Sequence, residues 1–208
     1  MAVYNLDKPE ISCKIVFYGT ARSGKTTSFK YLAEGDKGLL RDKIVTIKTE
    51  SDQAVFFDFI PIYLGKIEGF NVRVQLFTVS GQVEYRSTRK LVLRGVDGIV
   101  FVADSLEVRR EENIISLKDL EKNLRDSDKS IFKIPIVLLY NKRDLDEHIT
   151  PLMSIEKMEK DLNGRLKAPS FAGSAVDGYG VGKALKTCLK LMLPSLKEEL
   201  KGLLKRQT

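Results

Sequence analysis

Stretches of continuous apolar residues recur along the chain, separated by segments whose apolar residues fall on one helical face. The continuous runs are typical of strands buried on both sides of a sheet, and they lie at 15–18, 98–103 and 134–140. The helical faces are marked by apolar residues at steps of three and four, namely Leu117, Leu120 and Leu124, then Leu185, Leu189, Met192 and Leu193. This alternation predicts an α/β fold in which a mostly parallel sheet carries helices on both faces.

One pair of strands has a different pattern. Residues 55–60 are largely apolar, and after a turn near Gly69 the apolar Phe70, Val72 and Val74 alternate with polar residues. A short turn between two such segments predicts an antiparallel pair at one edge of the sheet.

The first apolar run leads into a glycine-rich motif of the form G-x-x-x-x-G-K-T at residues 19–26. In such a phosphate-binding loop, glycines let the backbone turn its N–H groups toward phosphate oxygens, and the following helix directs its positive end at the same anion. We expect Lys25 to contact the β- and γ-phosphates and the hydroxyl of Thr26 to bind Mg²⁺. The residues expected around the phosphates are Gly19, Ala21, Arg22, Ser23, Gly24, Lys25, Thr26 and Thr27. An ordinary glycine-rich turn is the alternative, and a second motif downstream disfavours it.

That second motif is Asn141-Lys142-Arg143-Asp144, of the form N-K-x-D, directly after the run at 134–140. The carboxylate of Asp144 can accept two hydrogen bonds from guanine, whereas adenine has no matching pair of donors. Asn141 can bind the base edge or the phosphate loop, and the stem of Lys142 can lie along a ring face. Both motifs follow strands, and α/β sheets bind ligands at the carboxyl ends of strands, so a guanine nucleotide is the expected ligand.

These motifs and the stretches between them resemble the bacterial MglA-type branch of the Ras-like small GTPases over nearly the whole chain. Thr78, where most Ras-like proteins have aspartate, is a trait of that branch. The resemblance implies a P-loop NTPase with a Ras-like G domain, whose mostly parallel six-stranded sheet has one antiparallel edge. The segments that carry it are 11–16, 25–27, 56–59, 78–82, 89–93, 95–105 and 140–144.

The same resemblance implies a GTP-dependent switch for cell polarity or gliding motility. Its ligands would be GTP or GDP with Mg²⁺, and its partners a roadblock-type (MglB-like) activating protein and effectors. It also gives a role to Ser174-Ala175-Val176, because Ras-like proteins carry Ser-Ala-Lys there and donate a backbone N–H to the guanine carbonyl. Val176 replaces that lysine here, and a plain turn from strand to helix explains the segment about as well.

Hydrolysis of GTP requires an oriented water, stabilised phosphoryl charge and a positioned Mg²⁺, without a covalent protein intermediate. The catalytic candidates are Gln82, which follows Gly81 and is expected to orient the water, and Lys25 at the phosphates. Gly81 would let the backbone approach the γ-phosphate. The alternative for Gln82 is a polar loop residue with no catalytic role.

In the first switch, two positions depart from the family pattern, because members carry Arg and Thr where this chain has Gln53 and Ala54. Ala54 has no oxygen for Mg²⁺, and Gln53 is neutral where an arginine finger is worth roughly 10³- to 10⁵-fold in rate. Hydrolysis is therefore expected to be slow. The candidate substitutes are Thr49, Ser51, Arg22 and Arg86.

Composition bears on the number of domains and on binding to nucleic acid, membranes and metals. The chain has 208 residues, 43% hydrophobic, without a linker-like or repeated segment, so one domain over 1–208 is expected, with a C-terminal helix from about 181. The net charge of +7 is scattered among acids, which disfavours a nucleic-acid surface. No apolar run reaches the length of a membrane span, and Cys13 and Cys188 lack the spacing of a metal site.

We therefore expect a cytoplasmic protein without an integral membrane segment, recruited to the membrane or cell pole by partners. The segment after Pro194 is expected to pack on the domain or a partner, with a membrane surface as the alternative. The leading function is a slow GTPase switch, and the second is a GTP-binding scaffold with impaired hydrolysis. A P-loop kinase or other ATPase is disfavoured by Asp144 of the N-K-x-D motif.

Overall fold

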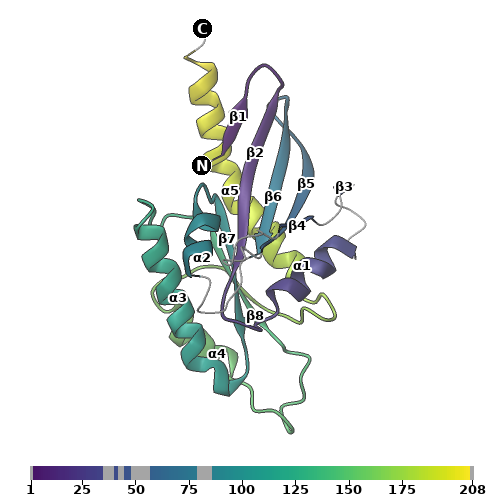
Figure 1. Ribbon diagram of the computed structural model, residues 1–208, viewed down its shortest axis with the longest axis vertical. Coiled ribbons are helices and arrows are strands. Elements are labelled where there is room, and N and C mark those ends of the chain that lie inside the picture. Colours follow the sequence, from purple (N-terminus) through teal and green to yellow (C-terminus); the bar gives the residue numbers. More distant parts are fainter. Residues whose placement is uncertain (1, 35–39, 42–44, 48–56, 79–85, 207–208) are drawn as a thin grey trace.

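The computed structural model describes residues 2–34, 40–41, 45–47, 57–78 and 86–206 (Figure 1). The strands are β1 (Val3–Asn5), β2 (Glu10–Tyr18), β3 (Leu40–Arg41), β4 (Val45–Ile47), β5 (Phe57–Ile67), β6 (Phe70–Thr78), β7 (Gly98–Asp104), β8 (Ile136–Asn141) and β9 (Ser170–Ala172). The α-helices are α1 (Lys25–Glu34), α2 (Arg86–Leu93), α3 (Arg110–Arg125), α4 (Ile155–Met158) and α5 (Val181–Leu204). A 3₁₀ helix at Glu107–Arg109 precedes α3, and a π-helical segment at Glu159–Asn163 continues α4.

The strands form one sheet whose main order is β3-β5-β6-β2-β7-β8-β9. The pairs β6–β2, β2–β7, β7–β8 and β8–β9 are parallel, and β5–β6 is antiparallel. The predicted α/β fold with a mostly parallel sheet and one antiparallel edge is therefore confirmed. Within the described residues, three short strands extend the predicted six, because β1 pairs with β2 and both β3 and β4 pair with β5.

The antiparallel pair β5–β6 forms at the hairpin predicted from its alternating pattern. Its register runs from Phe59 opposite Phe77 to Ile67 opposite Phe70, with a shift between Tyr63 and Lys66. The turn residues Glu68 and Gly69 both have positive φ, at 49° and 86°. Two successive positive φ angles match the right-handed twist of the flanking strands, so this tight turn keeps the pair in register.

Side chains of the central strands alternate between two hydrophobic cores. In β2, Ile15 and Phe17 pack in the core that also contains residues of α1 and α5, while Val16 and Tyr18 pack in the core that contains residues of α2 and α3. All seven residues of β7 are buried, as expected for a strand covered on both faces. The helices therefore cover both faces of the sheet, and the loops at its carboxyl edge start from strands packed on both sides.

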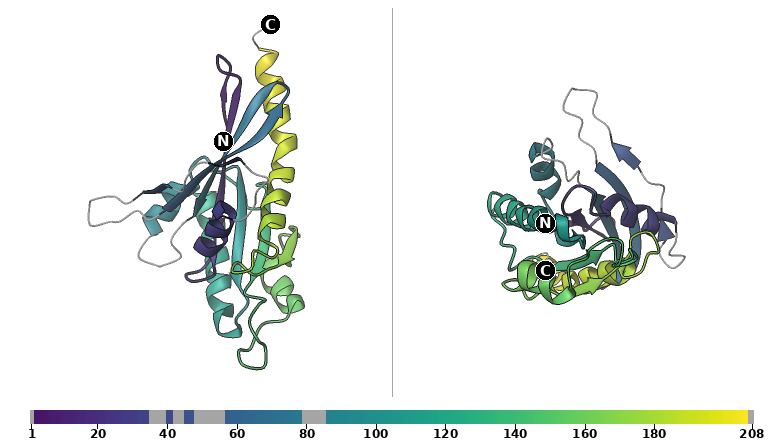
Figure 2. Two further views of the ribbon diagram at one scale, coloured as in Figure 1. Left: turned by 90° about the vertical axis from the view of Figure 1, so that its right-hand side faces the viewer. Right: turned by 90° about the horizontal axis from the view of Figure 1, so that it is seen from below.

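Helix α5 runs alongside the strands, and its C-terminal part lies beside the β1–β2 hairpin (Figures 1 and 2). The segment after Pro194 continues the helix, and its Leu196 and Leu200 are buried in the core. The Tyr4 hydroxyl donates to the Leu196 carbonyl at 3.2 Å and to the Glu199 carboxylate at 3.0 Å. This segment therefore packs on the body of the protein, one of the arrangements expected from sequence.

Both cysteines are buried free thiols, and burial raises the pKa of each to about 12. Cys188 lies against the start of β7, where a Cβ on Gly98 would come within 2.8 Å of its sulfur. Among the described residues, no helix is both long and apolar enough to cross a membrane.

Candidate functional site

The predicted nucleotide motifs meet at the carboxyl edge of the parallel strands. The phosphate loop follows β2, Asp104 ends β7, Asn141 ends β8, and the segment 173–175 follows β9. Because β2, β7, β8 and β9 are successive parallel neighbours, their following loops converge on one edge. This is the edge where ligands bind in α/β sheets of this type.

The phosphate loop approaches neighbouring residues so closely at Gly19 and Gly24 that neither position has room for a side chain. Gly19 has φ of 145°, and a Cβ there would lie 2.2 Å from the Val102 carbonyl oxygen. Gly24 has φ of 99°, and its Cβ would lie 2.0 Å from Nδ2 of Asn141. Arg22 also has a positive φ, 61°, although it has a side chain. Such strained backbone persists where surrounding contacts hold it, and it is concentrated at ligand sites.

Lys25 begins α1 directly under this loop. Its Nζ donates to the carbonyl oxygens of Gly19 at 3.0 Å and Thr20 at 2.6 Å, and its side chain is almost fully buried. Burial, together with the positive charge of Arg89, lowers the pKa of Lys25 to about 7. An anion bound in the loop would restore the favourable environment of the ammonium group, so the site is suited to phosphate.

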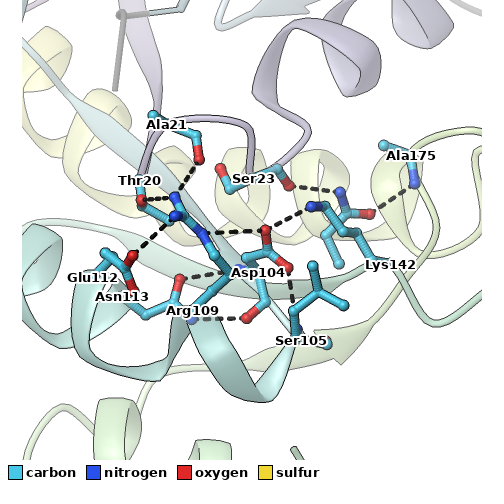
Figure 3. A network of polar contacts seen from close by, with 12 residues as sticks. Thr20, Ala21, Ser23, Asp104, Ser105, Arg109, Glu112, Asn113, Lys142 and Ala175 are labelled. Atoms are coloured by element: carbon cyan, nitrogen blue, oxygen red, sulfur yellow. Dashed lines mark hydrogen bonds and ion pairs between the residues drawn. The ribbon is translucent and has the colours of Figure 1, made fainter. Parts of the chain in front are cut away.

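Asn141 joins three of the predicted motifs through its side-chain amide. Nδ2 donates to the Ser23 carbonyl oxygen at 2.7 Å, and Oδ1 accepts from the Ala175 N–H at 2.7 Å (Figure 3). Only 1% of Asn141 is exposed, so both bonds are protected from water. Of the two roles expected for this residue, the structure shows contact with the phosphate loop. It also shows that Ala175 holds Asn141 in place.

Lys142 contacts a residue to which the sequence analysis assigned no role. Its Nζ donates to Oδ2 of Asp104 at 2.6 Å, and the Asp104 side chain is fully buried. Arg109 approaches the same carboxylate, with Nε 3.9 Å from Oδ2, and its Nη2 donates to the phosphate loop at Thr20 and Ala21 (Figure 3). The sequence did contain a signal for Asp104, because it is an aspartate at the carboxyl end of a buried strand and ligands bind at that edge of such sheets.

The remaining predicted residues lie around this centre. Ser174 is buried, whereas Asp144, Thr26, Thr27 and Val176 are exposed. The exposed Asp144 is accessible to a ligand from outside, as recognition of a base edge requires. Its neighbour Arg143 is held by the protein, because its N–H donates to the Gly173 carbonyl at 3.0 Å and its guanidinium to the Met153 carbonyl at 2.5 Å.

The residues present also fit Mg²⁺ bound together with a polyphosphate. Mg²⁺ takes oxygen ligands, keeps several waters and commonly relies on phosphate oxygens. Thr26 supplies an exposed hydroxyl beside Lys25, and Thr78 lies at the end of β6, which adjoins the phosphate-loop strand. Among the described residues, no group of three or more His, Cys, Asp or Glu side chains could hold a metal unaided. Mg²⁺ bound at Thr26 would take further ligands from phosphate oxygens and water.

Several predicted residues cannot be placed in this geometry. Gly81 and Gln82 lie outside the described residues, as do the positions of the family departures, Gln53 and Ala54. The candidate substitutes Thr49 and Ser51 also lie outside them. Arg86 is the first residue of α2.

Comparison with known proteins agrees with the motifs. Residues 2–192 match the model of the ADP-ribosylation factor family. The chain is 44% identical over 198 residues to the mutual gliding-motility protein MglA of Myxococcus xanthus (strain DK1622), a match that covers 95% of this chain and 99% of that protein. The chain therefore belongs to the Ras-like small GTPases of the ADP-ribosylation factor family, and within them to the MglA type.

Proposed function

We propose that this protein binds GTP and GDP with Mg²⁺ at the carboxyl edge of its sheet and acts as a slowly hydrolysing molecular switch. The observation that carries the proposal is the position of Asn141. Its two 2.7 Å hydrogen bonds hold the phosphate loop and the 174–176 segment around the N-K-x-D motif. One buried amide thus fixes the relative positions of the groups expected to bind phosphate and base.

Each part of the nucleotide has a proposed set of contacts. The phosphates would be bound by the N–H groups of residues 19–27 and by the Lys25 ammonium, and the guanine by Asp144. Lys142 and the 174–176 segment would border the base. Thr26 would hold Mg²⁺, which when bound neutralises charge on the β- and γ-phosphates.

Hydrolysis depends on residues around the γ-phosphate. In the proposal, Gln82 orients the attacking water, the Gly81 backbone approaches the phosphate, and Lys25 stabilises the charge on the transferred group. In the proposal the rate is slow because Gln53 and Ala54 lack the charge and the hydroxyl that the resemblance to MglA-type GTPases implies at these positions. These two replacements favour the second candidate function, a scaffold that holds GTP with impaired hydrolysis.

The biological process is proposed from the relative. The Myxococcus protein is named for gliding motility, and we propose a role in motility or cell polarity for this chain. Its proposed partners are a roadblock-type activating protein and effectors that recognise the GTP-bound form, with recruitment from the cytoplasm to a membrane or cell pole through those partners.

Single-turnover phosphate release from protein preloaded with Mg²⁺·GTP distinguishes the two candidate functions. The wild type and the double variant Gln53→Arg/Ala54→Thr are compared with and without a roadblock-type partner. Partner-stimulated turnover of the wild type supports the switch. Stable GTP in the wild type, with turnover restored in the double variant, supports the scaffold. A wild type that holds no guanine nucleotide contradicts both.

A further inference from the structure

The network around Asp104 extends beyond the motifs that define the nucleotide site. Asp104 ends β7, and its fully buried carboxylate accepts from Lys142 Nζ at 2.6 Å through Oδ2 and from the Leu106 N–H at 3.1 Å through Oδ1. The backbone of Asp104 is also fixed, because the Asn113 amide accepts from its N–H at 3.0 Å and donates to its carbonyl at 2.7 Å. Asp104 is therefore a rigid anion within the site.

Arg109 connects this anion to the phosphate loop. Its Nε lies 3.9 Å from Asp104 Oδ2, and its Nη1 donates to the Glu112 carboxylate at 2.9 Å. Its Nη2 donates to the Thr20 hydroxyl at 3.1 Å and to the Ala21 carbonyl at 2.9 Å (Figure 3). All three guanidinium nitrogens are thus engaged. The contacts use oxygen atoms of the loop, whereas its N–H groups are the ones that bind phosphate.

Both loops at the ends of this connection contain a strained residue. Lys142 in the N-K-x-D motif has φ of 73°, and Arg22 in the phosphate loop, next to Ala21, has φ of 61°. Left-handed backbone at a residue with a side chain persists only where neighbouring contacts over-determine it. The Lys142–Asp104 bond and the Arg109–Ala21 bond supply such contacts on the two sides.

We propose that Arg109 is a positioning residue which, through Asp104, couples the phosphate loop to the base-binding loop and slows the release of bound nucleotide. The inference rests on the proposed function, since it concerns the same site. The connection through Arg109 and Asp104 is a second link between the two loops, beside the Asn141–Ser23 bond, and it contacts a different part of the phosphate loop. Because Lys142 and Arg109 share one buried carboxylate, loss of either cation weakens the support of both loops.

Release of a fluorescent GDP analogue, chased with excess GDP, tests this role. We expect Arg109→Met to accelerate release by about tenfold, within the range of typical couplings between sites. Arg109→Lys should be intermediate, because lysine keeps the charge but not the fork of donors. Asp104→Asn should also accelerate release. Arg125→Met, at an exposed position at the end of α3, is the matched control and should release GDP like the wild type.

Two further readouts separate positioning from a general loss of stability. The ³¹P resonances of bound GDP should shift in Arg109→Met but not in Arg125→Met, because only the former changes the phosphate loop. In a double-mutant cycle on release rates, Arg109→Met and Lys142→Met should be non-additive, because both act through Asp104.

These experiments separate failure of the inference about Arg109 from failure of the proposed function. If the wild type does not bind GDP, the proposed function fails and this inference with it. If the wild type binds GDP but Arg109→Met, Arg109→Lys and Asp104→Asn all release it at the wild-type rate, only the inference is overturned. Unchanged release with slower single-turnover hydrolysis in Arg109→Met would overturn it too, because Arg109 would then act on the reacting phosphate.

Discussion

Gly24 lies so close to Asn141 that a Cβ atom on Gly24 would stand 2.0 Å from the Asn141 Nδ2. The two residues are far apart in the chain, and each belongs to a different nucleotide motif. The absence of a side chain at Gly24 lets the Asn141 amide reach the Ser23 carbonyl at 2.7 Å. The second glycine of the phosphate loop therefore makes room for the asparagine of the N-K-x-D motif.

Gly24→Ala should weaken binding of both GDP and GTP by about 10- to 100-fold. The methyl group displaces Asn141, and alanine at a φ of 99° adds strain of about 1–3 kcal/mol, where 1.4 kcal/mol corresponds to tenfold in affinity. Equilibrium titration with a fluorescent nucleotide measures the loss. Gly202→Ala is the matched control, because a Cβ there meets nothing within 4 Å. Unchanged affinity in Gly24→Ala would contradict the proposed coupling of the two motifs.

Nucleotide affinity should fall as the pH rises above 7. The pKa of Lys25 is lowered to about 7 by burial and by Arg89, and bound phosphate would raise it again. Binding then takes up a proton above pH 7, so affinity should fall by at most about tenfold per pH unit. Isothermal titration in buffers of different ionisation enthalpy measures this proton uptake directly. A nucleotide affinity that is constant between pH 7 and 9 would contradict proton uptake by Lys25.

The lowered pKa of Lys25 should also make the nucleotide-free protein more stable as the pH rises from about 7 toward 10.5. In that window the unfolded chain holds the Lys25 proton and the folded chain does not, so the free energy of unfolding increases with pH. The increase is at most about 1.4 kcal/mol per pH unit. Denaturant titration should show that Lys25→Met lacks this component.

The end of α5 supplies a stability test. Leu200 is fully buried and Leu204 is 36% exposed, although both lie on the segment after Pro194. Leu200→Ala should lower the free energy of unfolding by about 2–5 kcal/mol, whereas Leu204→Ala should change it by less than about 1 kcal/mol. If thermal and denaturant unfolding show the same small effect for Leu200→Ala and Leu204→Ala, this segment does not pack on the domain in solution.

Gln82→Leu should slow hydrolysis without weakening GTP binding, because leucine cannot orient the attacking water. The measurement is single-turnover phosphate release in the presence of the activating partner, with GTP affinity determined in parallel. If the wild type hydrolyses GTP and Gln82→Leu does so at the same rate, Gln82 has no part in the mechanism. Loss of GTP binding would instead indicate that the residue supports the nucleotide site.

The layered fold was predictable because strands buried on both faces appear as continuous apolar runs, as in β7, and amphipathic helices show apolar residues at steps of three and four, as in α3. The motifs of the phosphate loop and of residues 141–144 were recognisable in the sequence because each is defined by a few consecutive residues. Strands β1, β3 and β4 were not predicted, since two or three residues are too short to show a period. The contacts of Arg109 with Thr20 and Ala21 were not predicted, because they arise only when β2 and β7 become neighbours.

Base selection by Asp144 tests the central claim most directly. Wild type and Asp144→Asn are titrated with fluorescent GDP, ADP and xanthosine diphosphate in the presence of Mg²⁺. The account predicts that the wild type prefers GDP strongly over both others and that Asp144→Asn shifts the preference toward xanthosine diphosphate, because an amide reverses the hydrogen-bonding match with the base. Equal binding of ADP by the wild type, or an unchanged preference for GDP in Asp144→Asn, would contradict it.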